Sequence, residues 1–343
     1  MEFFYMHMPI SGCDIFWPGL VLIGFSVGVI GGFFGMGGAW MVTPGLNILG
    51  FPMAFAIGTD VAHMAGKSMI STMRHSKFGN VDYKMGVIMV IGTFIGIEVG
   101  AQIVMYLERI GMVTSIVRWA YVVVLALIAF MVFYDYYKAS QGAKKKSREP
   151  MHMGAGGGIN WAPTLHKIHI PPMMHFKVSG ITCSMWLPIF VSFLTGILAG
   201  FLGIGGGLIR MPSLVYFVGL PTHIAVGTDL FEVMISGLYG AFTYSLKGRI
   251  EMVAVFVMLC GAAIGAQIGT VATKYAKGYG IRILFGLAVV ACMISVILKQ
   301  FGVNTLATVI ILGSISLISL YIMVVMFRGA AAELREKKTG ARV

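Results

Sequence analysis

The sequence predicts an all-α polytopic membrane protein made of two inverted-topology repeats. Hydrophobic residues make up 58% of the chain and charged residues only 11%, a balance that ordinary soluble domains do not have. Apolar runs of about 20 residues recur, the length that a helix needs to cross a hydrocarbon core of about 30 Å. A motif of glycines, a proline and a Gly-Thr-Asp triplet occurs in both halves. The continuous apolar runs exclude a transmembrane β-barrel, whose short strands alternate apolar and polar residues.

Charge and cysteine content exclude other classes. The formal net charge of +12 would suggest a nucleic-acid partner in a soluble protein. Membrane proteins, however, collect Lys and Arg on their cytoplasmic side, so we expect no nucleic acid. The four cysteines have no CxxC spacing, which argues against a metal site or a disulfide framework. No basic stretch precedes the first apolar run, so we expect no cleaved signal peptide.

The repeated motif begins with a glycine cluster and ends with an acid. Its copies are Gly35–Ala39, Pro44 and Gly58-Thr59-Asp60, and then Gly203–Gly207, Pro212 and Gly227-Thr228-Asp229. The spacing of the copies agrees to within one residue. Two further pairs align, namely Gly79–Asp82 with Gly248–Glu251 and Gly100–Gln102 with Gly265–Gln267. Recurrence in the same order indicates an internal repeat.

Hydropathy and the positions of polar, glycine-rich and proline-rich segments divide the chain into five parts. Residues 138–184 are basic, contain glycine, proline and histidine, and are too polar to span lipid. The parts are a first transmembrane repeat over 1–137, a cytoplasmic connector over 138–184, a second repeat over 185–298, an extra transmembrane helix over 299–327 and a cytoplasmic tail over 328–343.

The distribution of Lys and Arg predicts that the repeats are inverted. With the connector and tail in the cytoplasm, the turn that holds Arg74, Lys77 and Lys84 is inside, and the equivalent turn at Lys247 and Arg249 is outside. Inversion needs an odd number of crossings per half, whereas each half shows four apolar blocks. We therefore expect each glycine-broken block to enter and leave on one side as a hairpin of two half-helices, with three transmembrane helices after it.

The glycine clusters are candidate anion sites. Near-consecutive glycines followed by proline break a helix, and the half-helix that follows presents free N–H groups with a partial positive charge. The alternative is that the glycines only allow close helix packing. The candidate substrate-binding residues here are Gly35, Gly37, Gly38, Ala39, Gly203, Gly205, Gly206 and Gly207.

Ionisable residues within apolar segments are candidates for coupling or gating. Asp60, His63 and Lys67 share a helix face at i, i+3 and i+7, and Asp229 and Glu232 occupy the places of Asp60 and His63. Charges at such depth are costly and face a cavity or a partner. The alternative for both aspartates is that each caps the start of its own helix, since each follows Gly-Thr.

Other polar residues leave alternatives open. Neutral candidates for substrate binding are Thr59, Thr228, Gln102 and Gln267. Arg210 either attracts an anion or extends to the membrane interface, and we favour the interface. The connector histidines are expected in a solvated loop rather than at a metal; they are His152, His166, His169 and His175.

With these motifs, the chain resembles the TauE/SafE sulfite exporter family over residues 16–137 and 185–298. The resemblance rests on the doubled glycine, proline and Gly-Thr-Asp elements and on the GNVD and GRIE turns. It implies a carrier for sulfur-containing anions, such as sulfite, sulfoacetate or other organosulfonates, in the cytoplasmic membrane of a prokaryote.

The sequence therefore predicts a secondary transporter of small sulfur-containing anions that works by alternating access, with proton coupling through the buried acids. A passive anion channel and a non-transporting scaffold that uses the basic connector are the alternatives. No nucleophile–base set or metal-ligand cluster stands within the spans, so we expect neither an enzyme nor a cofactor. The expected partners are the anion and the lipid bilayer, and a homo-oligomer is left open.

Overall fold

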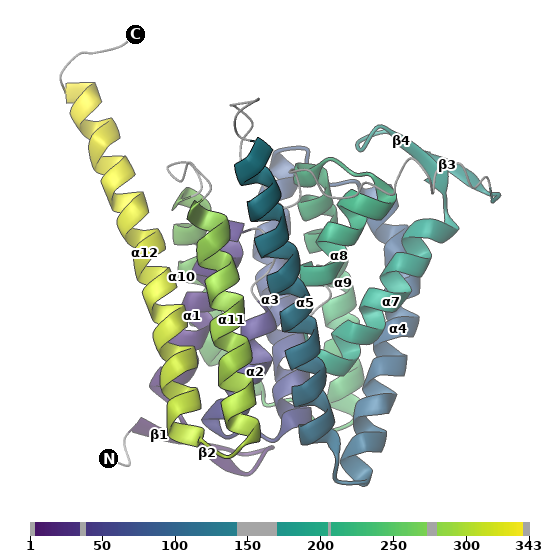
Figure 1. The fold of residues 1–343 in the computed structure, drawn as a ribbon. Coiled ribbons are helices and arrows are strands. Elements are labelled where there is room, and N and C mark those ends of the chain that lie inside the picture. The colour runs from purple at the N-terminus through teal and green to yellow at the C-terminus, as the bar shows by residue number, and fades with distance from the viewer. Residues whose placement is uncertain (1–3, 35–38, 143–169, 205–206, 273–279, 339–343) are drawn as a thin grey trace.

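The computed structural model describes residues 4–34, 39–142, 170–204, 207–272 and 280–338, and is almost entirely helical (Figure 1). The first half contains strands β1 (Tyr5–Met8) and β2 (Cys13–Phe16), and helices α1 (Trp17–Phe34), α2 (Val42–Leu49), α3 (Met53–Lys77), α4 (Tyr83–Arg109) and α5 (Val113–Gly142). The second half contains β3 (Met173–Phe176), β4 (Ile181–Ser184), α7 (Trp186–Leu202), α8 (Gly207–Ser213), α9 (Thr222–Leu246), α10 (Met252–Ala272) and α11 (Gly280–Gln300). Helix α12 (Asn304–Lys338) follows, and the described part of the first half contains no equivalent of it.

The prediction of an all-α polytopic membrane protein is confirmed. Among the described residues, six helices are long and apolar enough to cross a membrane: α9, α10 and most or all of α4, α5, α11 and α12. Helix α3 has the length of its equivalent α9, but it carries buried Asp60, His63 and Lys67 in addition to its basic C-terminal turn. Such side chains lower its mean hydropathy, although they face the protein interior.

A β-hairpin precedes the first helix of each half. Strand β1 pairs antiparallel with β2, and β3 pairs antiparallel with β4. The first hairpin lies at the lower end of the molecule in Figure 1 and the second at the upper end, as an inverted repeat requires. The β3–β4 hairpin lies within the segment that we expected to be connector.

The glycine-broken segments leave on the side where they enter. At the lower end, Gly50 after α2 faces Ile15, and Gly19 of α1 faces Leu49. In the second half, Val218 and Leu220 pack into one apolar cluster with hairpin residues that include Phe176 and Cys183. The chain therefore returns to the face of its own hairpin in both halves, as we expected of a re-entrant pair.

The second motif has one more residue between its proline and the following glycine (Pro212 to Gly219) than the first motif has (Pro44 to Gly50). A π-helical turn accommodates this residue. Helix α2 runs regularly from Val42 to Leu49 and ends at Gly50, whose φ is 119°. After α8, the chain forms a π-helical turn over Leu214–Val218 and ends at Gly219, whose φ is 86°. A single-turn π-helix accommodates one extra residue without ending the helix. Both glycines adopt the left-handed conformation that stops a helix.

The two halves exchange their first helices. Helix α1 packs along α10, and α7 packs along α4. Glycines line both seams: a Cβ added at Gly28 would lie 2.5 Å from the carbonyl oxygen of Ala262, and one added at Gly96 would lie 2.4 Å from that of Phe193. Backbones approach this closely only where side chains are small. The packing interpretation therefore explains many of the glycines outside the clusters.

A second contact between the halves is made by the Gly-Thr pairs. A Cβ added at Gly58 would lie 2.1 Å from the carbonyl oxygen of Arg249, and one added at Gly227 would lie 2.2 Å from that of Asn80. Beside them, the Thr59 hydroxyl accepts the backbone N–H of Glu251 at 3.1 Å. Each Gly-Thr pair thus holds the turn that begins a helix of the opposite half.

Alanine at Gly58 should destabilise the protein, because its methyl group meets a backbone carbonyl that cannot move aside. We expect a loss of about 1–3 kcal/mol, the usual range for overpacking. Gly313 in α12 is the matched control, since no heavy atom lies within 4 Å of an added Cβ. Gly313→Ala should be neutral or stabilising by up to about 1 kcal/mol. Thermal unfolding in detergent measures both, and equal melting temperatures would contradict the close contact.

Candidate functional site

The candidate ionisable residues lie on α3 and α9, which pack against each other across the two halves. Asp60, His63, Asp229 and Glu232 are almost completely shielded, and Lys67 is only 3% exposed. Charged groups are rarely removed from water to this extent without a partner. These residues form two clusters of different chemistry, one in each half.

The first cluster contains Asp60, His63 and Lys67. One carboxylate oxygen of Asp60 accepts the backbone N–H of Thr43 at 3.0 Å and its hydroxyl at 2.8 Å. The other oxygen lies 3.9 Å from His63 Nδ1. Among the described residues, that oxygen, both ring nitrogens of His63 and the Lys67 ammonium have no hydrogen-bond partner. The cluster therefore presents a buried ammonium that has no hydrogen-bond partner and meets the Asp60 carboxylate only at longer range, together with several unused polar atoms.

Asp60 occupies the N-terminus of α2. Thr43 is the second residue of that helix, and no side chain of the preceding residues caps it. The carboxylate accepts an otherwise free N–H and meets the positive end of the helix dipole. The half-helix N-terminus that we expected to be open to substrate is thus already bound by a carboxylate of the protein.

The second cluster contains Arg210, Asp229 and Glu232. Arg210 Nη1 forms ion pairs with Glu232 and with Asp229 Oδ1, which is 3.6 Å away, without a directional hydrogen bond to either. Its Nε donates to the Thr195 hydroxyl at 2.9 Å. One guanidinium is therefore balanced by two carboxylates, and this cluster is not in need of an external anion.

Two of our alternatives are wrong. Asp60 and Asp229 do not cap their own helices, because α3 begins at Met53 and α9 at Thr222. Arg210 does not extend to the membrane interface, since it is fully buried. Sequence alone could not exclude these alternatives, because they depend on where each helix begins and on which partner lies opposite.

The tips of the broken segments are described only in part. Gly35, Gly37, Gly38, Gly205 and Gly206 lie outside the described residues. Ala39 begins a 3₁₀ turn and Gly207 begins α8. Gly203, with a φ of 76°, ends α7. A Cβ there would lie 2.6 Å from Thr43 Oγ1 and 3.2 Å from Ile57 Cα, so the break of the second half approaches that of the first.

The neutral candidates divide into three environments. The Thr228 hydroxyl accepts the N–H of Asp82 at 2.9 Å, as Thr59 does for Glu251. Gln102 is exposed and donates to Glu98 at 2.6 Å. Gln267 lines a small cavity near the upper end of α3. Of the connector histidines, His175 pairs across the β3–β4 hairpin with Thr182, and the other three lie outside the described residues.

Sequence reasoning missed Thr43 and Thr195. The available signal was weak, because Thr43 precedes Pro44 in the broken segment but has methionine, Met211, at its place in the second copy. Thr195 lies on α7, where its hydroxyl also donates to carbonyls of the preceding turn. Both hydroxyls hold a charged side chain that is distant in sequence, and only the fold brings them together.

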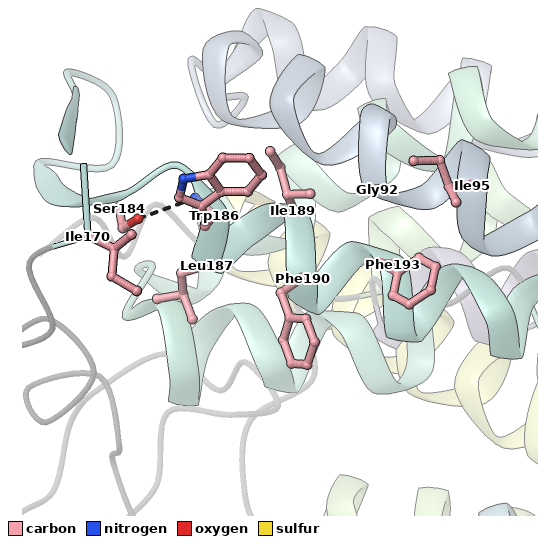
Figure 2. A pocket seen from close by; sticks show the side chains of 9 residues that line it. All are labelled: Gly92, Ile95, Ile170, Ser184, Trp186, Leu187, Ile189, Phe190 and Phe193. Carbon is pink, nitrogen blue, oxygen red and sulfur yellow. Dashed lines mark hydrogen bonds between the residues drawn. The ribbon is translucent and has the colours of Figure 1, made fainter. Parts of the chain in front are cut away.

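A large cavity elsewhere does not suit an ion. It measures about 490 Å³ and lies between α4 and α7, lined by Ile95, Trp186, Phe190, Phe193 and neighbouring residues (Figure 2). Trp186 and Phe190 are more than half exposed on the outside of the bundle. Because a membrane protein presents such a surface to lipid, an anion would be poorly solvated there.

The chain is similar to known membrane transporters. A probable membrane transporter protein, YunE, of Bacillus subtilis is 26% identical over 73% of this chain and 86% of its own length. One of Xylella fastidiosa is 24% identical over 82% and 93%. Sulfite exporter TauE/SafE family protein 5 of Arabidopsis thaliana is 32% identical over 33% of this chain and 25% of its own length.

No solved structure matches the chain. The family model described as sulfite exporter TauE/SafE matches residues 20–296, which include both copies of the motif, both buried clusters and the contacts between the halves. The chain is a multi-pass membrane protein that belongs to the TauE/SafE sulfite exporter family.

Proposed function

We propose that the protein is a secondary transporter that moves a small sulfur-containing anion by alternating access. Membership of a family of membrane transporters supports the general class, and the buried cluster that contains Lys67 supports the charge of the substrate. Sulfite, sulfoacetate and related organosulfonates are the substrate class, because the family model carries sulfite export in its description.

The observation on which this proposal depends most is the burial of the Lys67 ammonium without a hydrogen-bond partner. Its ammonium is buried on α3, and it has no hydrogen-bond partner within the described part of the chain. A buried cation that forms no hydrogen bond and meets its carboxylate, Asp60, only at longer range is stabilised further by an anion from outside. His63, one turn away, offers two further nitrogens that no neighbour uses.

Occupation of the α2 N-terminus strengthens the assignment. Since Asp60 already accepts the N–H and hydroxyl of Thr43, the substrate needs another source of positive charge. Lys67 supplies it, seven residues along the same helix face. Asp60 then lies between the N-terminus of α2 and the place proposed for the anion beside Lys67. Protonation of Asp60 therefore changes the net charge next to the bound anion.

We assign proton coupling to the buried acids. Binding of an anion beside Asp60 is favoured when that carboxyl is neutral, because two like charges repel at short range. In the second half, protonation of Asp229 or Glu232 would free Arg210 from one of its two ion pairs. Both clusters therefore link proton occupancy to the affinity for an anion.

We place the upper face of Figure 1 in the cytoplasm of a prokaryotic cell. Arg74 and Lys77 lie in the last turn of α3, and Lys84 donates to the carbonyl of His175 in the β3–β4 hairpin at that face; cytoplasmic loops are rich in such residues. The C-terminus is then cytoplasmic. The proposed division keeps the repeats at 1–137 and 185–298, the connector at 138–184, the extra helix at 299–327 and the tail at 328–343, with the β3–β4 hairpin as the part of the connector that resembles the start of the first repeat.

Lys67→Gln should lower anion uptake strongly while the protein remains in the membrane. A hydrogen bond to a charged group contributes about 1.5–3 kcal/mol, which corresponds to roughly a 10- to 150-fold loss of affinity. Flux into proteoliposomes, measured with sulfite, thiosulfate, sulfate and organosulfonates, tests both the substrate class and the residue. Lys84→Gln is the control, because Lys84 is exposed and donates to His175. Flux that never saturates would indicate a passive channel instead.

Removing the two buried cations should affect stability in opposite ways. Lys67→Met removes a buried ammonium that has no hydrogen-bond partner within the described part of the chain, so the melting temperature should stay or rise. Arg210→Met leaves two buried carboxylates without their partner, and breaking such a pair costs about 3–5 kcal/mol. Thermal unfolding in detergent without substrate measures both variants, and equal destabilisation would argue that the protein itself pairs Lys67.

Asp60→Asn and Asp229→Asn should remove the dependence of transport on a pH gradient. Asparagine keeps an oxygen that accepts from Thr43, so Asp60→Asn preserves the contact while it fixes the charge. Flux with and without an imposed proton gradient measures the effect. Asp14→Asn is the control, since Asp14 is exposed in the first β-hairpin. If both buried variants keep wild-type flux and pH dependence, the coupling role is wrong.

A further inference from the structure

A second cavity, lined by both apolar and polar residues, lies at the upper end of α3. It measures about 50 Å³, and a cavity of about 10–15 Å³ is enough to hold one water molecule. Helices α1, α3, α9 and α10 contribute to it. Its lining includes Gly31, Gly32, Ser71, Arg74, Leu230 and Gln267.

Arg74 gives this cavity its charge. The side chain is partly buried, and no ion pair or hydrogen bond to it is found within the described part of the chain. Ser71 and Gln267 add neutral hydrogen-bonding groups. A guanidinium with five N–H donors beside a hydroxyl and an amide is suited to bind a small oxyanion.

The cavity continues the polar face of α3. Lys67, Ser71 and Arg74 follow one another at intervals of four and three residues, so they lie on one side of the helix. Lys67 is deep in the protein and Arg74 is near the helix end. An anion bound at Arg74 is therefore two helical turns from Lys67 on one side of α3, with Ser71 between them.

The equivalent place at the lower end is filled by side chains. The repeat matches His75 to Tyr244, and Tyr244 is fully buried with its hydroxyl donating to the carbonyl of Gly200 at 2.5 Å. Gly200 is the counterpart of Gly32, which lines the upper cavity. The polar groups there are also engaged, because Glu98 accepts from Gln102 and Lys247.

The two ends of the molecule differ in charge because equivalent positions of the repeats carry different residues. Glu98 has Ala263 at its place in the second repeat, and Arg74 has Thr243. The upper cavity therefore lacks the acid that neutralises a cation at the lower end.

We propose that the Ser71–Arg74–Gln267 cavity is an entrance site that binds a small oxyanion from the upper face before it reaches Lys67. This inference rests on the proposed transport of anions.

Reaction of an introduced thiol measures the charge of this site without measuring transport. The variant is Ser71→Cys in a full-length chain whose native cysteines, Cys13, Cys183, Cys260 and Cys292, are replaced by alanine. An anionic methanethiosulfonate reagent should modify Cys at 71 about tenfold faster than a cationic one, because a fixed cation concentrates anions in a cleft. Sulfate or methanesulfonate should slow the anionic reagent; neither cleaves the disulfide product, whereas sulfite does.

Two variants show whether Arg74 is responsible. Arg74→Gln should abolish the preference for the anionic reagent and the protection by sulfate. Thr243→Cys, at the place equivalent to Arg74 at the lower end of the molecule, should be modified much more slowly than Ser71→Cys. In oriented vesicles, Ser71→Cys should react only with reagent added on the upper face. Equal rates for both reagents, or an unchanged preference in Arg74→Gln, would overturn the entrance site.

The same assay separates this inference from the proposed function. Lys67→Gln should lower transport strongly and keep the larger part of the charge preference at position 71, because Arg74 remains. If the wild-type protein moves no anion in the flux assay yet keeps the preference and the protection, the proposed function fails and the anion site stands. If transport depends on Lys67 while position 71 shows no preference, the entrance site alone fails.

Discussion

The structure depends on a close contact that is made twice, between a Gly-Thr pair of one half and a helix-starting turn of the other. At Gly58 the carbonyl of Arg249 occupies the space of a side chain, and at Gly227 the carbonyl of Asn80 does the same. The threonine that follows each glycine accepts an N–H that would otherwise be unsatisfied at the start of a helix. Each aspartate of the motif comes next in the chain. The contact that joins the halves therefore also fixes the depth of both buried acids.

The same turns anchor the β-hairpins. Asp82 accepts the N–H and hydroxyl of Ser179, and Glu251 accepts those of Ser11. Ser11 and Ser179 occupy equivalent hairpin positions one residue before a glycine. Each carboxylate thus connects a hairpin to the helix that begins beside it, and the Gly-Thr pair of α3 or α9 meets the same turn. The GNVD and GRIE turns are where three segments of the chain converge.

Much of this architecture could be predicted from sequence, because it is recorded in periodic and repeated residues. The spans follow from apolar length, and the re-entrant segments follow from combining the glycine clusters with the charge distribution. The hairpins were missed although Met6, His7, Ser11 and Gly12 recur as Met174, His175, Ser179 and Gly180. Short strands among polar residues carry little hydropathy signal, and the second copy lies in a segment whose composition indicated a connector.

The site was less predictable because it depends on contacts between distant residues. Periodicity placed Asp60, His63 and Lys67 on one face, yet it gave no indication that Asp60 binds the N-terminus of α2. The repeat matched Asp60 with Asp229, but their surroundings differ: Thr43 is replaced by Met211, and Val42 by Arg210. With Glu232 at the place of His63 and Ser236 at the place of Lys67 as well, the second cluster has an arginine paired with two acids where the first has a lysine without a hydrogen-bond partner. The halves share a backbone design and differ in chemistry.

The exchange of first helices between the halves has a consequence for synthesis. Helix α1 finds its glycine-lined seam on α10, which leaves the ribosome only after most of the chain has been made. Helix α7, by contrast, meets α4 when that helix is already in the membrane. The glycine-lined face of α1 therefore stays without its partner helix until α10 has been made. The corresponding face of α7 can pack against α4 as soon as α7 has been made. Neither half is a complete folding unit, and the last step of assembly joins the earliest helix to one of the latest.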